Sequence, residues 1–126
     1  MSPTYTVKVL TEFSAAHHLR DYVGDCARVH GHNWKVEIEV QANALNKIGM
    51  AMDFKDVKEA ANRIIQRLDH QDINALEPFT TINPTAENLA TYIYRELSQL
   101  VNDSRIRVSA IAIWETDRSC VRYTEE

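Results

Sequence analysis

Residues 32–44 read HNWKVEIEVQANA, and their regular alternation of apolar and polar side chains decides the fold of this chain. One set of alternate positions is apolar: Trp34, Val36, Ile38, Val40 and Ala42. The positions between them are polar: Lys35, Glu37, Glu39 and Gln41. Successive side chains of a β-strand point to opposite faces, so the pattern predicts a strand with one buried face and one face in water.

The segments before and after this strand carry two different periods. From Tyr5 to Phe13 most apolar residues occupy odd positions, with Lys8 and Glu12 at even ones, which predicts a second strand. After residue 44 the apolar spacing becomes three and four, as in an amphipathic helix: Phe54, Val57, Ala61, Ile64 and Leu68. Asp53 is a favoured N-cap residue for this helix.

A second helix is predicted to begin after Thr85 and to end at residues 102–104. Its apolar stripe is Ala86, Leu89, Ile93, Leu97 and Leu100. Two strands follow, one over residues 106–115 and one that carries Val121 and Tyr123. In the first of these we expect one face to hold Ile106, Val108, Ala110, Ala112 and Trp114. The order ββααββ predicts an α+β fold with both helices on one face of the sheet.

Length and composition restrict the class of protein. The 126 residues (14.5 kDa) suit a single domain spanning residues 1–126, and 44% hydrophobic residues are ordinary for a globule. A formal charge of −4 argues against nucleic acid as a bulk partner. Residues 1–10 lack the apolar run of a signal peptide, and no segment is apolar enough for a membrane span. We therefore expect a cytoplasmic protein with Cys26 and Cys120 reduced.

Four of the five histidines fall between His17 and His32. In an extended chain His30 and His32 point the same way, about 6.6 Å apart along the backbone. A neighbouring strand that ends at His17 would bring a third imidazole beside them. Three neutral histidines with an open fourth position are typical of catalytic zinc, so we predict a metal site on these three residues. The alternative is a set of ordinary polar residues at a strand end. His18 would point to the other side, without a metal role.

Four further residues are candidates for chemistry. Cys26 lies four residues before His30 and is either a small packing residue or a thiol with a lowered pKa. Asp69 and His70 follow the first helix and are either surface charges or a proton-exchange pair. Glu115 ends an apolar strand, where a carboxylate needs a partner, either a basic side chain or a ligand.

Six blocks of sequence, in order, carry a resemblance to a known family. They are residues 13–19 (FSAAHHL), 26–33 (CARVHGHN), 49–54 (GMAMDF), 68–74 (LDHQDIN), 84–88 (PTAEN) and 114–116 (WET). The chain resembles the 6-pyruvoyl-tetrahydropterin synthase and 6-carboxy-tetrahydropterin synthase family over nearly its whole length. The resemblance implies the tunnelling fold, a four-stranded antiparallel sheet with two helices whose subunits assemble into a β-barrel. It also implies homo-oligomers, trimers paired into hexamers, with active sites between subunits.

The resemblance assigns a role to each candidate residue. It implies zinc on the three histidines: His17, His30 and His32. It implies that Cys26 is the acid/base thiol, with Asp69 and His70 as its relay, and that Glu115 anchors the pterin ring. The partner is then a small-molecule pterin triphosphate. Arg28 is a candidate contact for the triphosphate, and a solvated arginine is the alternative.

The spacing between Cys26 and His30 bears on the reaction. A gap of three residues resembles the bacterial 6-carboxy enzymes that feed queuosine biosynthesis, whereas the animal 6-pyruvoyl enzymes have a longer gap. The resemblance thus implies a zinc-dependent lyase that converts 7,8-dihydroneopterin triphosphate to 6-carboxy-5,6,7,8-tetrahydropterin, releasing acetaldehyde and triphosphate. The alternatives are 6-pyruvoyl-tetrahydropterin synthase activity, a non-catalytic zinc-holding pterin-binding module, or an oligomer without metal.

Overall fold

The computed structural model describes residues 2–126 and confirms the predicted α+β fold with its ββααββ order. The strands are β1 (Tyr5–His17), β2 (His30–Ala42), β3 (Ile106–Thr116) and β4 (Ser119–Tyr123). The helices are α1 (Phe54–Leu68) and α2 (Ala86–Val101), with two short 3₁₀ helices, η1 (Asp25–Ala27) and η2 (Ile73–Ala75). The strands form one antiparallel sheet in the order β1-β2-β3-β4. Among the described residues, no helix has the length and apolar character to cross a membrane.

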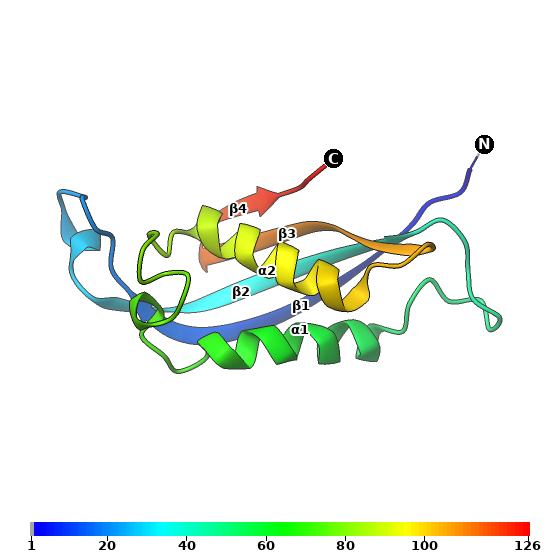
Figure 1. Cartoon of the computed structure of the whole chain (residues 1–126), viewed down its shortest axis with the longest axis horizontal. Coiled ribbons are helices and arrows are strands. Elements are labelled where there is room, and N and C mark those ends of the chain that lie inside the picture. The colour runs from blue at the N-terminus through cyan, green and yellow to red at the C-terminus, as the bar shows by residue number, and fades with distance from the viewer. Residues whose placement is uncertain (1) are drawn as a thin grey trace.

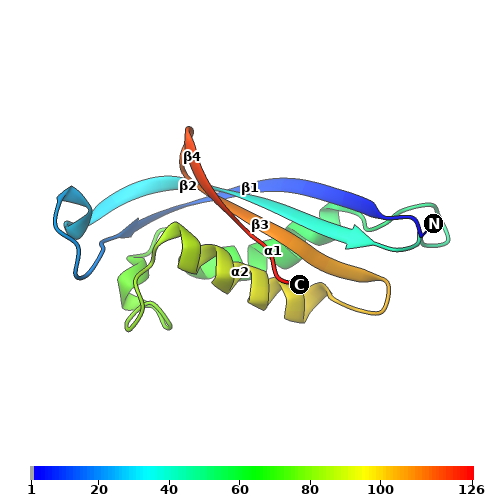
Figure 2. The same ribbon diagram turned by 90° about the horizontal axis from the view of Figure 1, so that it is seen from above.

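Both helices cover the same face of the sheet (Figure 1, Figure 2). The alternation in β2 places Trp34, Val36 and Ile38 on that face, and all three are fully buried. Leu68 of α1 and Leu97 of α2 are also fully buried and belong to the same core. The hydrophobic core therefore lies between the sheet and the two helices, as the apolar stripes predict.

The helix starts are capped as the sequence predicts. The side chain of Asp53 accepts a hydrogen bond from the backbone N–H of Lys55 (2.9 Å), and Thr85 Oγ1 accepts one from Asn88 N–H (3.1 Å). Two residues of the predicted stripes are exposed instead of buried, Phe54 (60%) and Leu100 (48%). The first begins α1 and the second lies in the last turn of α2, so both stand at the ends of the packed stripe.

The predicted face of β3 is wrong in its second half. Glu39 pairs with Ala110 but Val40 pairs with Val108, so Ser109 is an extra residue, a β-bulge. The bulge reverses the alternation, because it moves every later side chain to the other face. The core residues of β3 are consequently Ile106, Val108, Ile111 and Ile113. Ala110, Ala112 and Trp114 take the opposite face.

β1 and β2 pair over more residues than the apolar pattern predicts. β1 continues past Phe13 to His17, and β2 begins at His30 instead of about residue 32. The register runs from Tyr5 opposite Ala42 to His17 opposite His30. The apolar alternation fades before the strands end, since the last paired positions carry histidine, alanine and glycine. This register places histidines opposite one another.

Candidate metal centre

Three imidazoles and one carboxylate meet at one end of the sheet, on the face that the helices cover. They belong to His17, His30, His32 and Glu115, and one ligand atom from each lies within 4.8 Å of all the others. The imidazole centroids are 4.6 Å apart for His17 and His30, 4.8 Å for His30 and His32, and 5.3 Å for His17 and His32. The structure thus brings together the three histidines that the sequence singles out.

Strand register explains how these side chains converge. His17 pairs directly with His30, and His32 follows two positions later on β2 and shares its face. Glu115 arrives from β3 by a second irregularity. Trp114 pairs with Cys120 but Thr116 pairs with Ser119, so Glu115 is an extra residue in its strand. Such bulges redirect a side chain and are common beside functional sites.

Two backbone carbonyls fix the orientation of two imidazoles. Nδ1 of His17 lies 2.7 Å from the carbonyl oxygen of Pro84, and Nδ1 of His30 lies 2.7 Å from that of Arg28. A carbonyl oxygen only accepts hydrogen bonds, so each Nδ1 carries a proton, and in the neutral ring the lone pair then lies on Nε2. This arrangement of a ring nitrogen bonded to a backbone carbonyl is the usual support of a metal-binding histidine.

Burial favours the neutral form of two of the three imidazoles. His17 is 2% exposed, and its ring and that of His32 contact the fully buried ring of Trp34, with centroids 4.8 and 5.1 Å away. Burial lowers the pKa of His17 and of His32, which favours the neutral ring that binds a metal ion; Glu115 opposes this shift. Within residues 2–126, Nε2 of His17 and of His32 makes no hydrogen bond of good angular geometry, although Glu115 Oε1 lies 3.4 and 2.9 Å from them.

The donor set fits zinc. Neutral imidazoles, unsatisfied buried nitrogens and carbonyl-supported tautomers are the features of a zinc site with three histidines. Glu115 Oε1 lies 2.9 Å from Nε2 of His32 and 3.4 Å from Nε2 of His17. The Glu115 side chain is 34% exposed, so it stands at the outer edge of the cluster. The carboxylate can therefore face either a metal ion or a molecule bound beside it.

The predicted proton-exchange residues lie outside this four-residue cluster. Cys26 is a free, half-buried cysteine in η1, and its carbonyl accepts a hydrogen bond from Leu19 N–H (2.8 Å). Asp69 and His70 form a pair directly after α1, with His70 Nδ1 2.9 Å from Asp69 Oδ2. Backbone N–H donation from Ser14 lowers the pKa of Asp69, and His70 lowers it further. His70 is 81% exposed, so its ring faces solvent in the single chain.

Other candidates take supporting positions. His18 lies outside the cluster, and its backbone N–H donates to Asn74 Oδ1 (2.9 Å). Arg28 is exposed and contributes its carbonyl to His30. Sequence reasoning missed the supporting carbonyls of Pro84 and Arg28. Every residue has a carbonyl, so no sequence signal marks these two.

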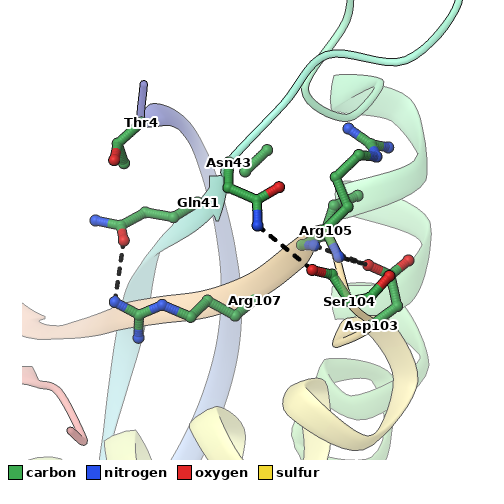
Figure 3. A pocket seen from close by; sticks show the side chains of 9 residues that line it. Thr4, Gln41, Asn43, Asp103, Ser104, Arg105 and Arg107 are labelled. Atoms are coloured by element: carbon green, nitrogen blue, oxygen red, sulfur yellow. Dashed lines mark hydrogen bonds between the residues drawn. The ribbon is translucent and has the colours of Figure 1, made fainter. Parts of the chain in front are cut away.

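A separate recess of about 280 Å³ lies at the other end of the same strands (Figure 3). Its two guanidinium groups have partners within the chain. Arg107 Nη2 donates to Gln41 Oε1 (3.0 Å), and Arg105 Nη1 donates to the carbonyls of Ala44 (2.9 Å) and Ala51 (2.8 Å). This recess lies at the start of β3, whereas Glu115 of the histidine cluster lies near its end.

Known proteins resemble this chain both in sequence and in structure. A family model described as 6-pyruvoyl tetrahydropterin synthase matches residues 6–126. A 6-carboxy-5,6,7,8-tetrahydropterin synthase of Haemophilus influenzae is 28% identical over 142 aligned positions, covering 94% of this chain and 99% of that protein. A 6-pyruvoyl tetrahydrobiopterin synthase of Poecilia reticulata is 33% identical over 128 positions, covering 90% and 86%. The structure of Caenorhabditis elegans 6-pyruvoyl tetrahydropterin synthase has a similar fold (TM-score 0.89, 24% identity, 99% and 98% coverage).

Proposed function

This chain belongs to the 6-pyruvoyl tetrahydropterin synthase family, and we propose that it is a zinc-dependent 6-carboxytetrahydropterin synthase. The reaction converts 7,8-dihydroneopterin triphosphate to 6-carboxy-5,6,7,8-tetrahydropterin and releases acetaldehyde and triphosphate. In this proposal the enzyme works in the cytoplasm and supplies queuosine biosynthesis. The observation that carries the proposal is the cluster of His17, His30, His32 and Glu115.

The three imidazoles would hold zinc through Nε2. Zinc bound there would supply a Lewis acid for the side-chain oxygens of the substrate. The carbonyls of Pro84 and Arg28 keep the rings of His17 and His30 in the required tautomer. Trp34, packed against His17 and His32, excludes water from the buried side of the site.

Glu115 binds the pterin ring. A pterin presents an amino group and a ring N–H side by side, and one carboxylate accepts both as a bidentate pair. The Glu115 carboxylate is partly exposed and adjoins the imidazoles, so a ligand held by it would have its side chain near the metal position. This placement supports a role as substrate anchor.

Cys26, Asp69 and His70 move protons. Asp69 accepts from His70 Nδ1–H, which orients the ring and leaves Nε2 available for proton transfer. The exposure of His70 and its separation from the cluster agree with a site shared between subunits, in which the pair serves the thiol of a neighbour. We therefore include a homo-oligomer of trimers, paired into hexamers, in the proposal.

A second activity has its own support. The relatives matched by this chain include proteins named for the 6-pyruvoyl reaction, which eliminates triphosphate without breaking a carbon–carbon bond. The short gap between Cys26 and His30 favours the 6-carboxy reaction.

Product analysis separates these activities. The zinc-loaded protein is incubated with 7,8-dihydroneopterin triphosphate, acetaldehyde is assayed, and the pterin is identified by mass spectrometry. The proposal predicts acetaldehyde and the 6-carboxy product in equal amounts. A 6-pyruvoyl product without acetaldehyde would contradict it, and tight pterin binding without turnover would identify a binding module.

A further inference from the structure

The segment between α1 and α2 covers the outer edge of β1 just before the histidine cluster. Ser14 N–H donates to Asp69 Oδ1 (2.9 Å), and Ser14 C=O accepts from His70 N–H (2.6 Å). Ala16 N–H then donates to the carbonyl of Gln71 (3.0 Å). The N–H groups of residues 14 and 16 point away from β2. This segment therefore supplies hydrogen-bond partners for backbone groups that have none within the sheet.

Two side-chain carboxamides continue this pairing beyond the end of the strand. Asn74 Oδ1 accepts from His18 N–H (2.9 Å), and Asn74 Nδ2 donates to His18 C=O (3.1 Å). Asn83 Oδ1 accepts from Arg20 N–H (2.9 Å), and Asn83 Nδ2 donates to Arg20 C=O (3.0 Å). Each carboxamide thus takes both backbone groups of one residue, as the peptide of a neighbouring strand would.

Both asparagines are themselves held in place. Asn74 is 8% exposed, and its N–H donates to Asp72 Oδ1 (3.1 Å). The carbonyl of Asn83 accepts from Asn88 Nδ2 (2.9 Å), which ties it to α2. Rigid partners of this kind can transmit their positions to the chain they bind.

The side chain of Arg20 in turn donates hydrogen bonds to the segment between α1 and α2. Its guanidinium donates to the carbonyls of Phe79 (2.7 Å) and Ile82 (3.2 Å), within the same connecting segment. The arginine side chain therefore organises the loop while the loop asparagines hold the arginine backbone. This use of the guanidinium within the chain also makes Arg20 a poor candidate for binding the triphosphate.

We propose that Asn74 and Asn83 are positioning residues for the metal ligand His17, an inference that rests on the zinc site proposed above. His17 is the last residue of β1, and the chain leaves the sheet directly after it. Asn74 holds the next residue. Asn83 holds Arg20 and precedes Pro84, whose carbonyl accepts from the His17 ring (2.7 Å). The two asparagines therefore hold the backbone that follows His17, and Asn83 also adjoins the residue whose carbonyl holds the His17 ring.

The test measures zinc affinity and the geometry of the site without relying on turnover. Loss of an outer-shell partner typically weakens metal binding about 10- to 100-fold. We expect Asn83→Ala and Asn74→Ala to weaken zinc binding by this factor, measured by competition with a chromophoric chelator. We also expect a changed visible spectrum for bound Co²⁺. Asn83→Asp, which keeps the acceptor for Arg20 N–H and loses the donor, should have an intermediate effect.

Asn102→Ala is the matched control. Asn102 Oδ1 likewise accepts from a backbone N–H, that of Val108 (2.7 Å), next to the start of β3 and away from the cluster. This variant should lower the melting temperature while zinc affinity and the Co²⁺ spectrum stay unchanged.

The outcomes separate this inference from the proposed function. All measurements are made at a temperature where circular dichroism shows each variant folded, and Asn83→Asp carries the test if an alanine variant does not fold. Wild-type zinc affinity and an unchanged Co²⁺ spectrum in the folded Asn74 and Asn83 variants would overturn the positioning role. Failure of the wild-type protein itself to bind zinc would overturn the proposed function and the inference with it.

Discussion

Replacing Glu115 with glutamine is expected to weaken binding of the pterin ring and to leave zinc in place. Glu115 Oε1 lies 2.9 Å from Nε2 of His32, so the carboxylate adjoins the metal position. Three imidazoles nevertheless form a complete ligand set for a catalytic zinc ion, whose fourth position stays open for water or substrate. A carboxamide has nearly the same shape as the carboxylate, so this change alters charge and hydrogen bonding while disturbing packing little.

The size of the effect follows from the hydrogen bonds at stake. A hydrogen bond to a charged group contributes about 1.5–3 kcal/mol. Glutamine keeps one acceptor and turns an NH₂ donor towards a donor of the ligand, so at least one such bond is lost. At about 1.4 kcal/mol per factor of ten, the dissociation constant should rise about 10- to 100-fold. The 34% exposure of Glu115 lets water compensate in part, which places the loss in the lower half of this range.

The assay uses neopterin, a pterin without phosphate, so that contacts to the triphosphate do not contribute to the measured affinity. Its dissociation constant is determined by fluorescence titration of zinc-loaded wild-type and Glu115→Gln protein, and zinc is quantified in both. Asp117→Asn is the control, because it removes one negative charge two residues away on an 84% exposed side chain. Loss of zinc from Glu115→Gln would identify the carboxylate as a ligand and refute the reasoning, as would unchanged neopterin binding.

Three further predictions concern catalysis, pH dependence and the core. Cys26→Ala should abolish turnover while zinc and neopterin still bind; undiminished product formation would exclude the thiol from the reaction. Backbone N–H groups of Arg105 and Ile106 lower the pKa of Asp103, so its charged form stabilises the fold above its unfolded pKa near 4. Asp103→Asn should therefore lower the free energy of unfolding at pH 7, and its difference from wild type in urea titrations should shrink as pH falls from roughly 5; a gap that stays constant into acid would contradict this. Leu68→Ala, at a fully buried position, should cost about 2–5 kcal/mol in the same titrations, and a loss below 1 kcal/mol would show that the site collapses around the change.

The fold was largely predictable because its signals are periodic and repeated. The alternation in residues 32–44 and the two helical stripes each involve at least five apolar side chains, so one exception changes little. The face of β3 was not predictable from alternation, because one inserted residue, Ser109, reverses it. A serine in an apolar run does not distinguish a bulge from a regular strand.

The candidate site was predictable only where local spacing determines it. His30 and His32 share a face in any extended strand, whereas the pairing of His17 with His30 depends on the register of β1 on β2. The approach of Glu115 to the imidazoles depends on a second bulge. The hydrogen bonds between Asn74 and His18, and between the His17 ring and the Pro84 carbonyl, depend on the path of a loop. The sequence carries no periodic signal for that path.

The most direct test of the central claim is a titration of zinc into metal-free protein, with acetaldehyde release from 7,8-dihydroneopterin triphosphate as the readout. The described residues hold one cluster of this kind, so acetaldehyde production should rise linearly and saturate near one zinc per chain. His32→Ala, which removes one ligand, should show no such saturation over the same range. Full acetaldehyde release from the metal-free protein, or none after zinc has bound, would contradict a zinc-dependent 6-carboxytetrahydropterin synthase.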